Sequence, residues 1–464
     1  MKNLLAIISV FCCCMLTFGQ SNFTQYQLNN TAQSQYLNPA FRSSSKIGVS
    51  VAPFSNFLNL QLLNTGFSLD DALATRPDSD TLDLTPDKLL SNLNDVNYLD
   101  LNFKAEILGL VITTKKSSIS LTINSVVNSG FSYPKDLLRL AFYGNGSEEF
   151  LGKRASIDNL GVDALAYLET GIGFNRKFND KLVIGGKIKY LIGVGNLQTQ
   201  NLQAGIYTDS ITYALEGDFA GQVNTTNYEG LQSTVSGISG SFNPFSMFRN
   251  LAGVKNNGIG FDIGATYKLG KKIRLSASVI DIGSITWRDG VTNYQVDEVK
   301  YEFKGIDLFQ YLEDSNAIID DIADSLETLA NYKESNNEYS TRLYTKAYLG
   351  GNFNITKFFN VGMVWFSSFN PSRYITGLNL SANVKLRHWL AASANYSVYN
   401  YRDSNVGLGL SARSGPFQIY VMSDNVIALI KPEATKNLHF NFGMSIQVGK
   451  SHEYDKRNEE MSIF

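Results

Sequence analysis

The chain has 464 residues and a formal net charge of −2, which is too close to zero for nucleic-acid binding by charge alone. Its only cysteines are Cys12, Cys13 and Cys14, and all of them lie in an N-terminal apolar run. Once that run is removed, the chain can form no disulfide framework, thiolate nucleophile or cysteine metal site.

Residues 1–20 have the layout of a secretory signal peptide. Lys2 supplies the positive charge, an apolar run extends from Leu4 to Phe18, and Gly19 is a small residue at the expected cleavage point. A membrane anchor is the alternative, but the run is shorter than the roughly 20 residues that a spanning helix needs. No later segment approaches that length, so we predict a mature chain without a transmembrane helix.

Residues 21–45 are polar and rich in Asn and Gln, and they contain Asn38-Pro39-Ala40. We interpret them as an N-terminal extension that enters a lumen. From residue 46 onward, apolar and polar residues alternate over long stretches, which is the period of a β-strand. Strands are predicted at 46–52, 56–64, 98–113, 118–124, 163–175, 182–192, 200–215, 216–223, 258–269, 273–287 and 291–303, then at 341–354, 357–369, 374–386, 389–400, 404–413, 417–424 and 438–449.

Two of these strands show the pattern in detail. In the first long strand, the apolar phase changes at Leu108, which predicts a β-bulge there. The last strand, 438–449, alternates without interruption and exceeds the roughly 9–11 residues that a tilted membrane strand needs. Its apolar face carries Leu438, Phe440, Phe442, Met444, Ile446 and Val448.

Four inserts interrupt the strands, near 66–97, 133–160, 224–257 and 305–337, and residues 450–464 form a charged tail. The insert at 305–337 has apolar residues at helical spacing, with Asp320, Asp321, Asp324 and Glu327 on the other side. It is interpreted as an amphipathic helix that caps a barrel mouth, and an acidic partner-binding site is the alternative.

The length of the strands and the position of their charges favour an all-β, transmembrane antiparallel barrel over residues 46–449. Soluble sandwiches commonly use strands of about 5–6 residues, whereas many strands here have ten or more. Charged residues such as Lys104, Glu106 and Lys385 fall on the polar face, which lines a wet lumen while lipid covers the apolar face. A closed ring also leaves no unpaired backbone edge in hydrocarbon. A soluble β-protein remains the alternative.

Two glycine-rich strands resemble those of FadL-like outer-membrane barrels: Gly258-Ile259-Gly260-Phe261-Asp262 onward, and Val279-Ile280-Asp281-Ile282-Gly283 onward. Asn38-Pro39-Ala40 is also similar to this group, to PorV-like barrels of type IX secretion and to PorP/SprF-like proteins. The overall layout resembles an uncharacterised branch named only as a domain of unknown function. The resemblance implies about 14 strands (we expect 12–18), an N-terminal segment in the lumen, and either passage of hydrophobic solutes or a role in secretion and surface assembly.

Catalysis has little support in the sequence. The histidines are His388, His439 and His452, and no pair has metal-ligand spacing. A hydrolase would need a Ser or Asp with a histidine partner, and His439 with a nearby lumen carboxylate is the candidate for it. We therefore predict a protein that is not an enzyme and has no cofactor or metal.

The candidate lumen residues are polar and fall in or beside strands: Glu169, Lys187, Lys189, Asp262, Asp281 and Asp424. One interpretation is a solvated ion-pair network that holds the lumen or its plug, and the other is a polar constriction on a solute path.

For function, the first hypothesis is an outer-membrane barrel that binds or transports hydrophobic or small solutes. The second is a structural barrel that anchors a secretion or surface-assembly system. The expected partners are outer-membrane lipid, with either a hydrophobic small molecule or a secreted or surface protein, and no nucleic acid.

Overall fold

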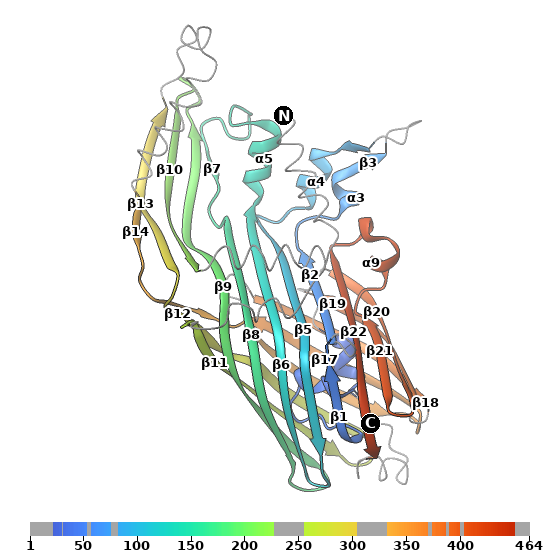
Figure 1. Cartoon of the computed structure of the whole chain (residues 1–464). Coiled ribbons are helices and arrows are strands. Elements are labelled where there is room, and N and C mark those ends of the chain that lie inside the picture. Colours follow the sequence, from blue (N-terminus) through green and yellow to red (C-terminus); the bar gives the residue numbers. More distant parts are fainter. Residues whose placement is uncertain are drawn as a thin grey trace.

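The computed structural model describes residues 22–29, 31–52, 57–75, 82–226, 255–303, 332–369, 374–386, 389–399 and 403–450. Most of them belong to one antiparallel sheet that closes on itself (Figure 1). β1 (Ser45–Val51) and β2 (Phe57–Asn64) share one position in the ring, between β5 (Val96–Thr113) and β22 (Asn437–Lys450). These pairings join the beginning of the chain to its end and close the barrel.

The ring has fourteen strand positions, which confirms the predicted all-β antiparallel barrel and its expected strand number. From β5 it continues through β6 (Ser117–Pro134), β8 (Gly161–Lys177), β9 (Leu182–Thr208), β11 (Asn257–Leu269), β12 (Ile273–Trp287) and β16 (Thr345–Asn354). It then passes through β17 (Phe359–Phe369), β18 (Tyr374–Leu386), β19 (Leu390–Tyr399), β20 (Asp403–Ser414) and β21 (Phe417–Ser423) to β22.

β9 differs from the sequence prediction, which divided it into strands at 182–192 and 200–215. It is one strand of 27 residues. Its first part pairs with β11 in the ring, and its last part pairs with β10 (Leu215–Thr226). β10 pairs in turn with β13 (Val291–Phe303), which pairs with β14 (Lys333–Ser335). The predicted strands 216–223 and 291–303 therefore lie outside the ring, in a sheet that extends beyond it together with β7 (Arg154–Ser156), as Figure 1 shows.

Short segments join the strands at one end of the barrel, and longer ones join them at the other. The inserts at the second end contain α3 (Leu69–Ala72), β3 (Leu73–Thr75), β4 (Leu82–Leu84), α4 (Pro86–Asn92) and α5 (Lys135–Tyr143). Ala72, Leu89, Leu90, Leu93 and Tyr133 pack together there in a small core. β15 (Tyr339–Arg342), α9 (Ile427–Ile430) and the 3₁₀ turn η3 (Pro432–Ala434) complete the elements around the wall.

The outer face of the wall is apolar, as the alternation predicts. Ile172, Ile188 and Ile263 are 62%, 62% and 57% exposed, and Leu410 is 57% exposed. A band of aliphatic side chains around a closed ring is typical of an outer-membrane barrel, because lipid removes that surface from water. The predicted bulge is confirmed, since the register of β5 against β6 shifts between Glu106 and Leu108.

No helix within the described residues is both long and apolar enough to cross a membrane.

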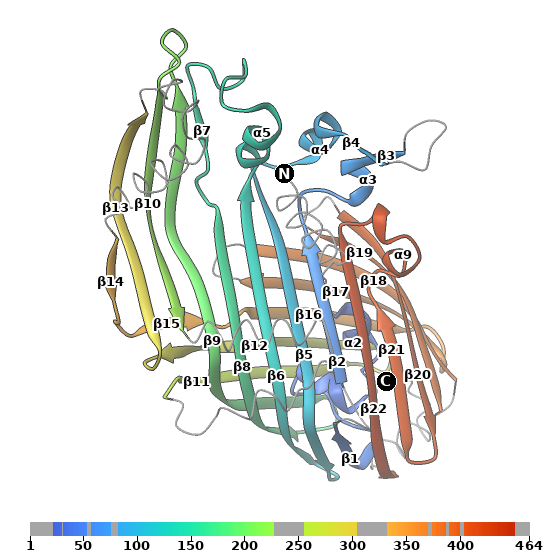
Figure 2. The same cartoon turned by 45° about the horizontal axis from the view of Figure 1, so that its top comes forward.

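The predicted lumen segment is confirmed. Residues 22–29 and 31–44, which we call the plug, enter the ring and include α2 (Phe23–Gln27) and the 3₁₀ turn η1 (Ala32–Tyr36). Figure 2 shows α2 surrounded by wall strands, and every residue of α2 is buried.

Several predictions concern residues outside the described ranges: the signal peptide at 1–20, the tail beyond 450, His388 and His452, and most of the inserts at 224–257 and 305–337. The acidic residues Asp320, Asp321, Asp324 and Glu327 fall in that last insert, so their role stays a prediction.

Candidate functional site

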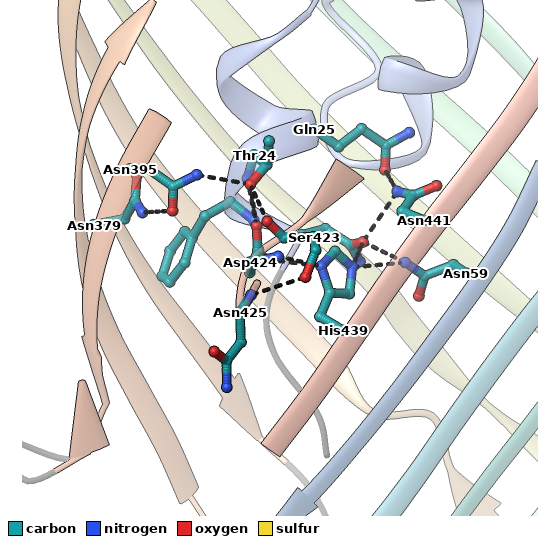
Figure 3. A network of polar contacts seen from close by, with 12 residues as sticks. Thr24, Gln25, Asn59, Asn379, Asn395, Ser423, Asp424, Asn425, His439 and Asn441 are labelled. Atoms are coloured by element: carbon teal, nitrogen blue, oxygen red, sulfur yellow. Dashed lines mark hydrogen bonds and ion pairs between the residues drawn. The ribbon is translucent and has the colours of Figure 1, made fainter. Parts of the chain in front are cut away.

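The first half of the plug is held by Asp424, which follows β21 (Figure 3). Its two carboxylate oxygens accept the backbone N–H groups of Phe23 and Thr24, each at 2.8 Å, and one of them also accepts the Thr24 hydroxyl. The first N–H groups of a helix have no partner within the helix. Asp424 supplies that partner from the wall, and its side chain is fully buried.

His439 lies beside Asp424, and both of its ring nitrogens contact polar groups of the protein. Its Nδ1 accepts the backbone N–H of Asp424 at 2.9 Å, so the ring proton is on Nε2. That nitrogen faces the side-chain oxygen of Asn22 at 2.9 Å. It also faces the amide of Asn59 at 3.1 Å (Figure 3). Both ring nitrogens are therefore occupied, and neither faces a hydroxyl that it could activate. The hydrolase alternative has no geometric support at this histidine.

A second polar group, deeper in the wall, contains the other lumen residues predicted from the sequence. The ammonium nitrogen of Lys189 lies 2.7 Å from a carboxylate oxygen of Asp262 and 2.5 Å from one of Asp281. It also lies 3.5 Å from a carboxylate oxygen of Glu169. The carboxylate of Glu169 also forms ion pairs with the ammonium groups of Lys104 at 3.2 Å and Lys187 at 3.8 Å. We call these six side chains the charge cluster. Glu169, Lys187, Lys189 and Asp262 are each at most 5% exposed, whereas the side chains of Lys104 and Asp281 are 19% and 13% exposed, so the network is mostly shielded from solvent.

Asp281 reaches this cluster through a local distortion of β12. Its φ is +60°, in the left-handed region that few residues other than Gly adopt. The register of β11 against β12 shifts at this point, and the side chain of Asp262 accepts the backbone N–H of Asp281 at 2.8 Å. Asp262 thus binds Lys189 and also holds the bulge that brings a further carboxylate to the same lysine.

The second half of the plug inserts Tyr36 into the charge cluster. The ammonium groups of Lys104 and Lys187 lie 4.8 and 4.6 Å from the centre of its ring, which is a cation–π distance for each. Its hydroxyl donates to Glu106 and lies 3.0 Å from Asn124. Burial and the adjacent Glu106 carboxylate raise the pKa of Tyr36 well above its usual range, so the hydroxyl keeps its proton and remains a donor.

Directly after Tyr36, the plug backbone lies against the wall at Asn38 and Pro39. Asn38 donates to the carbonyl oxygen of Ala277 at 3.1 Å. A Cβ at Gly264 would lie 2.1 Å from the side-chain oxygen of Asn38, and one at Gly185 would lie 2.4 Å from the carbonyl oxygen of Pro39. The glycines of β9 and β11 therefore permit a close approach that no other residue would allow.

The plug and the wall also share an aromatic cluster in the lumen. Tyr26 stacks on Tyr348 with ring centres 5.0 Å apart, and Phe23 contacts Phe366 at 6.0 Å and Tyr399 at 5.5 Å. All five rings are less than 5% exposed. The wall therefore presents an apolar surface to the lumen, and side chains of the plug cover it.

An open apolar groove of about 730 Å³ lies on the other side of the wall, over β16 to β20. Its ridges are Met363, Leu380 and Tyr396, which are 50–53% exposed on the outer face. The groove faces lipid and is separate from the plug. Among the described residues, no group of three or more His, Cys, Asp or Glu side chains is placed to hold a metal ion.

The structure thus brings together five of the six predicted lumen residues and places Asp424 apart from them, at the start of α2. Sequence reasoning put Lys104 and Glu106 on the polar face but did not connect them to this site. It missed Tyr36 altogether, since a tyrosine in a polar N-terminal segment gives no signal of the wall lysines that contact it.

Comparison with known proteins shows that the chain belongs to a family of unknown function, DUF5723, whose model matches residues 39–424. No curated protein matches the sequence significantly.

Among solved structures, the chain is similar to a TodX monoaromatic hydrocarbon channel with a deltaS2S3 mutation, at 11% identity and a TM-score of 0.41, over 94% of this chain and 98% of that one. It is also similar to a Pseudomonas aeruginosa FadL homologue, at 12% identity and a TM-score of 0.41, over 92% and 95%. These likenesses are distant, and the fold stands on the strand pairings of this chain itself.

Proposed function

We propose that this member of the DUF5723 family is an outer-membrane barrel that binds and passes hydrophobic or small solutes, with the plug as its internal gate. The observation that carries the proposal is the aromatic surface inside the lumen. Tyr348, Phe366 and Tyr399 form a core with the plug, and they would offer the same apolar surface to a solute once the plug moved aside. A hydrophobic solute needs such a surface, because burying apolar area is what favours its binding.

In this proposal, Phe23 and Tyr26 occupy the surface when no solute is present. The plug is held by hydrogen bonds at Asp424 and by cation–π contacts at Tyr36. A solute that binds the aromatic surface gains about 25 cal/mol per Å² of apolar area, and it must displace plug side chains that gain the same. The gate is therefore a competition between the solute and the plug.

The test is binding of an environment-sensitive naphthylamine dye to the full chain in detergent. We expect saturable binding that is weakened about tenfold by Phe366→Ala, which removes wall surface, and strengthened by Phe23→Ala, which removes the competitor. Phe261→Ala is the matched control, since Phe261 is 49% exposed on the lipid-facing side. Dye binding that is unaffected by both lumen variants would refute the proposal.

A second candidate is a structural barrel in a secretion or surface-assembly system, and the sheet beyond the ring favours it. β13 pairs with β10 along its length, from Val291 to Phe303, whereas β14 pairs only with Asn293 to Gln295. In the described part of the chain, the far end of β13 is therefore a sheet edge, to which an extended segment of a partner could add. A photocrosslinker at Tyr301 in native outer membranes would report a protein partner there. The absence of any crosslinked protein would count against this role.

A further inference from the structure

A row of residues near the end of the barrel with the longer connections differs from the charge cluster. Asp100, Gly130 and Asp163 are paired neighbours on β5, β6 and β8. Asp100 and Asp163 are 3% and 5% exposed. They lie on the lumen face, because residues two positions apart on a strand share a face and Lys104 and Glu169 of the charge cluster lie an even number of positions away. Two buried carboxylates thus flank a residue without a side chain, across three strands that span about 10 Å.

Several oxygen atoms surround the space that Gly130 leaves open. The position of a Cβ on Gly130 lies 3.2 Å from Asp100 Oδ1, 3.8 Å from the Tyr344 hydroxyl and 3.9 Å from the carbonyl oxygen of Asp163. Tyr344 comes from the segment between β15 and β16, and its hydroxyl donates to that carbonyl at 3.4 Å. Residues from opposite parts of the wall therefore converge on one oxygen-lined space.

Among the described residues, the carboxylate of Asp163 has no cationic partner that would neutralise its charge. Both of its oxygens are shielded from solvent, and neither makes a hydrogen bond of normal length to any of the described residues, while the Tyr344 hydroxyl lies close enough to stabilise the carboxylate only weakly. The side-chain oxygen of Asn102, two residues along β5 on the same face, also has no hydrogen-bond partner among the described residues. Burial of an unpaired carboxylate costs several kcal/mol. Glu169, on the same strand as Asp163, avoids that cost through its lysines, whereas Asp163 forms no salt bridge with any residue that the structure describes.

We propose that Asp100 and Asp163, with the neighbouring neutral oxygens, bind a hard divalent cation of the Ca²⁺ type. Ca²⁺ takes 6–8 oxygen ligands from carboxylates, carbonyls, amide oxygens and water in flexible geometry. Softer metals prefer imidazole or thiolate ligands, and the residues named here offer neither. The bound cation neutralises the two carboxylates and ties β5, β6 and β8 to the segment that carries Tyr344. With two carboxylates, an affinity of about 10⁻⁴ to 10⁻³ M is expected, as for other Ca²⁺ sites outside the cell.

The test is calorimetric titration of CaCl₂ into the full chain, folded in detergent and first treated with a chelator. We expect one saturable site in the unaltered protein and at least tenfold weaker binding for Asp163→Asn, which keeps the shape of the side chain but removes its charge. Asp209→Asn is the matched control: Asp209 accepts backbone N–H groups in the exposed turn after β9, remote in sequence from the site. It should bind Ca²⁺ as the unaltered chain does.

Folding of each variant is checked by its faster gel mobility before boiling, a property of intact barrels. If Asp163→Asn does not fold, the same titration of Tyr344→Phe decides, because it removes one neutral oxygen and should weaken binding severalfold. The proposal is overturned if the unaltered chain shows no saturable Ca²⁺ binding, or if folded Asp163→Asn binds Ca²⁺ as tightly as the Asp209→Asn control.

Discussion

The bond between Asp424 and the start of α2 determines how firmly the plug is docked, and Asp424→Asn tests it. The carboxylate accepts two backbone N–H groups and a hydroxyl. Asn offers one acceptor oxygen and directs an NH₂ donor at the remaining N–H. A buried hydrogen bond to a charged group contributes about 1.5–3 kcal/mol, and an unsatisfied buried donor adds a further cost. We expect the docked state of the plug to lose about 2–4 kcal/mol.

At 1.4 kcal/mol for each factor of ten, this loss makes the undocked plug roughly 30- to 700-fold more populated. Hydrogen exchange measured by mass spectrometry reports that population, since amides exchange when a segment opens locally. Peptides covering residues 23–28 should exchange faster by this factor in Asp424→Asn, while peptides from β5 and β6 should be unchanged. Dye binding to the aromatic surface should also become tighter, because the competitor is released.

Asp209→Asn is again the control, because its carboxylate also accepts two backbone N–H groups, but in an exposed turn. It should leave exchange in the plug unaltered. If a folded Asp424→Asn protein keeps full protection over residues 23–28, then Asp424 does not hold the plug, and the competition described for the gate loses its basis.

Three further predictions concern the charge cluster, the close approach of the plug and the outer sheet. Lys189→Met leaves three buried carboxylates without their shared cation, and the midpoint of urea unfolding should fall by the equivalent of about 3–5 kcal/mol, whereas Lys300→Met, at a side chain that is 78% exposed, should change it by less than about 0.5 kcal/mol. Gly185→Ala places a Cβ against the plug backbone and should speed exchange in residues 37–41, while Gly146→Ala, where a Cβ has nothing within 4 Å, should not. In the sheet beyond the ring, the Arg154 guanidinium lowers the pKa of Asp158 to about 2. Because this folded-state pKa is depressed, its contribution is complete above about pH 4 and is lost as the pH falls towards 2. Exchange protection over residues 154–158, corrected for the intrinsic rate, should fall in that window and should show no such step in Asp158→Asn.

Much of the fold could be predicted because the period of a strand is a local property. Alternation identified most of the wall strands, placed Ile172 and Ile263 on the outer face and located the bulge before Leu108. It failed at β9, because one uninterrupted strand can pair with β11 over one part and with β10 over another. The alternation of side chains along a strand does not specify which strand is its pairing partner. For the same reason the sequence did not show that β13 lies outside the ring.

The candidate site divides in the same way. The sequence determined which side chains face the lumen, since that depends only on the position of a residue along its strand, and it selected Glu169, Lys189 and Asp262 on this basis. Only the tertiary structure decided which of them meet. Register between neighbouring strands, the curvature of a closed ring and the path of the plug bring Tyr36 against two lysines and Asp424 to the start of α2. Contacts across a lumen join residues hundreds of positions apart, and no local pattern in the chain specifies them.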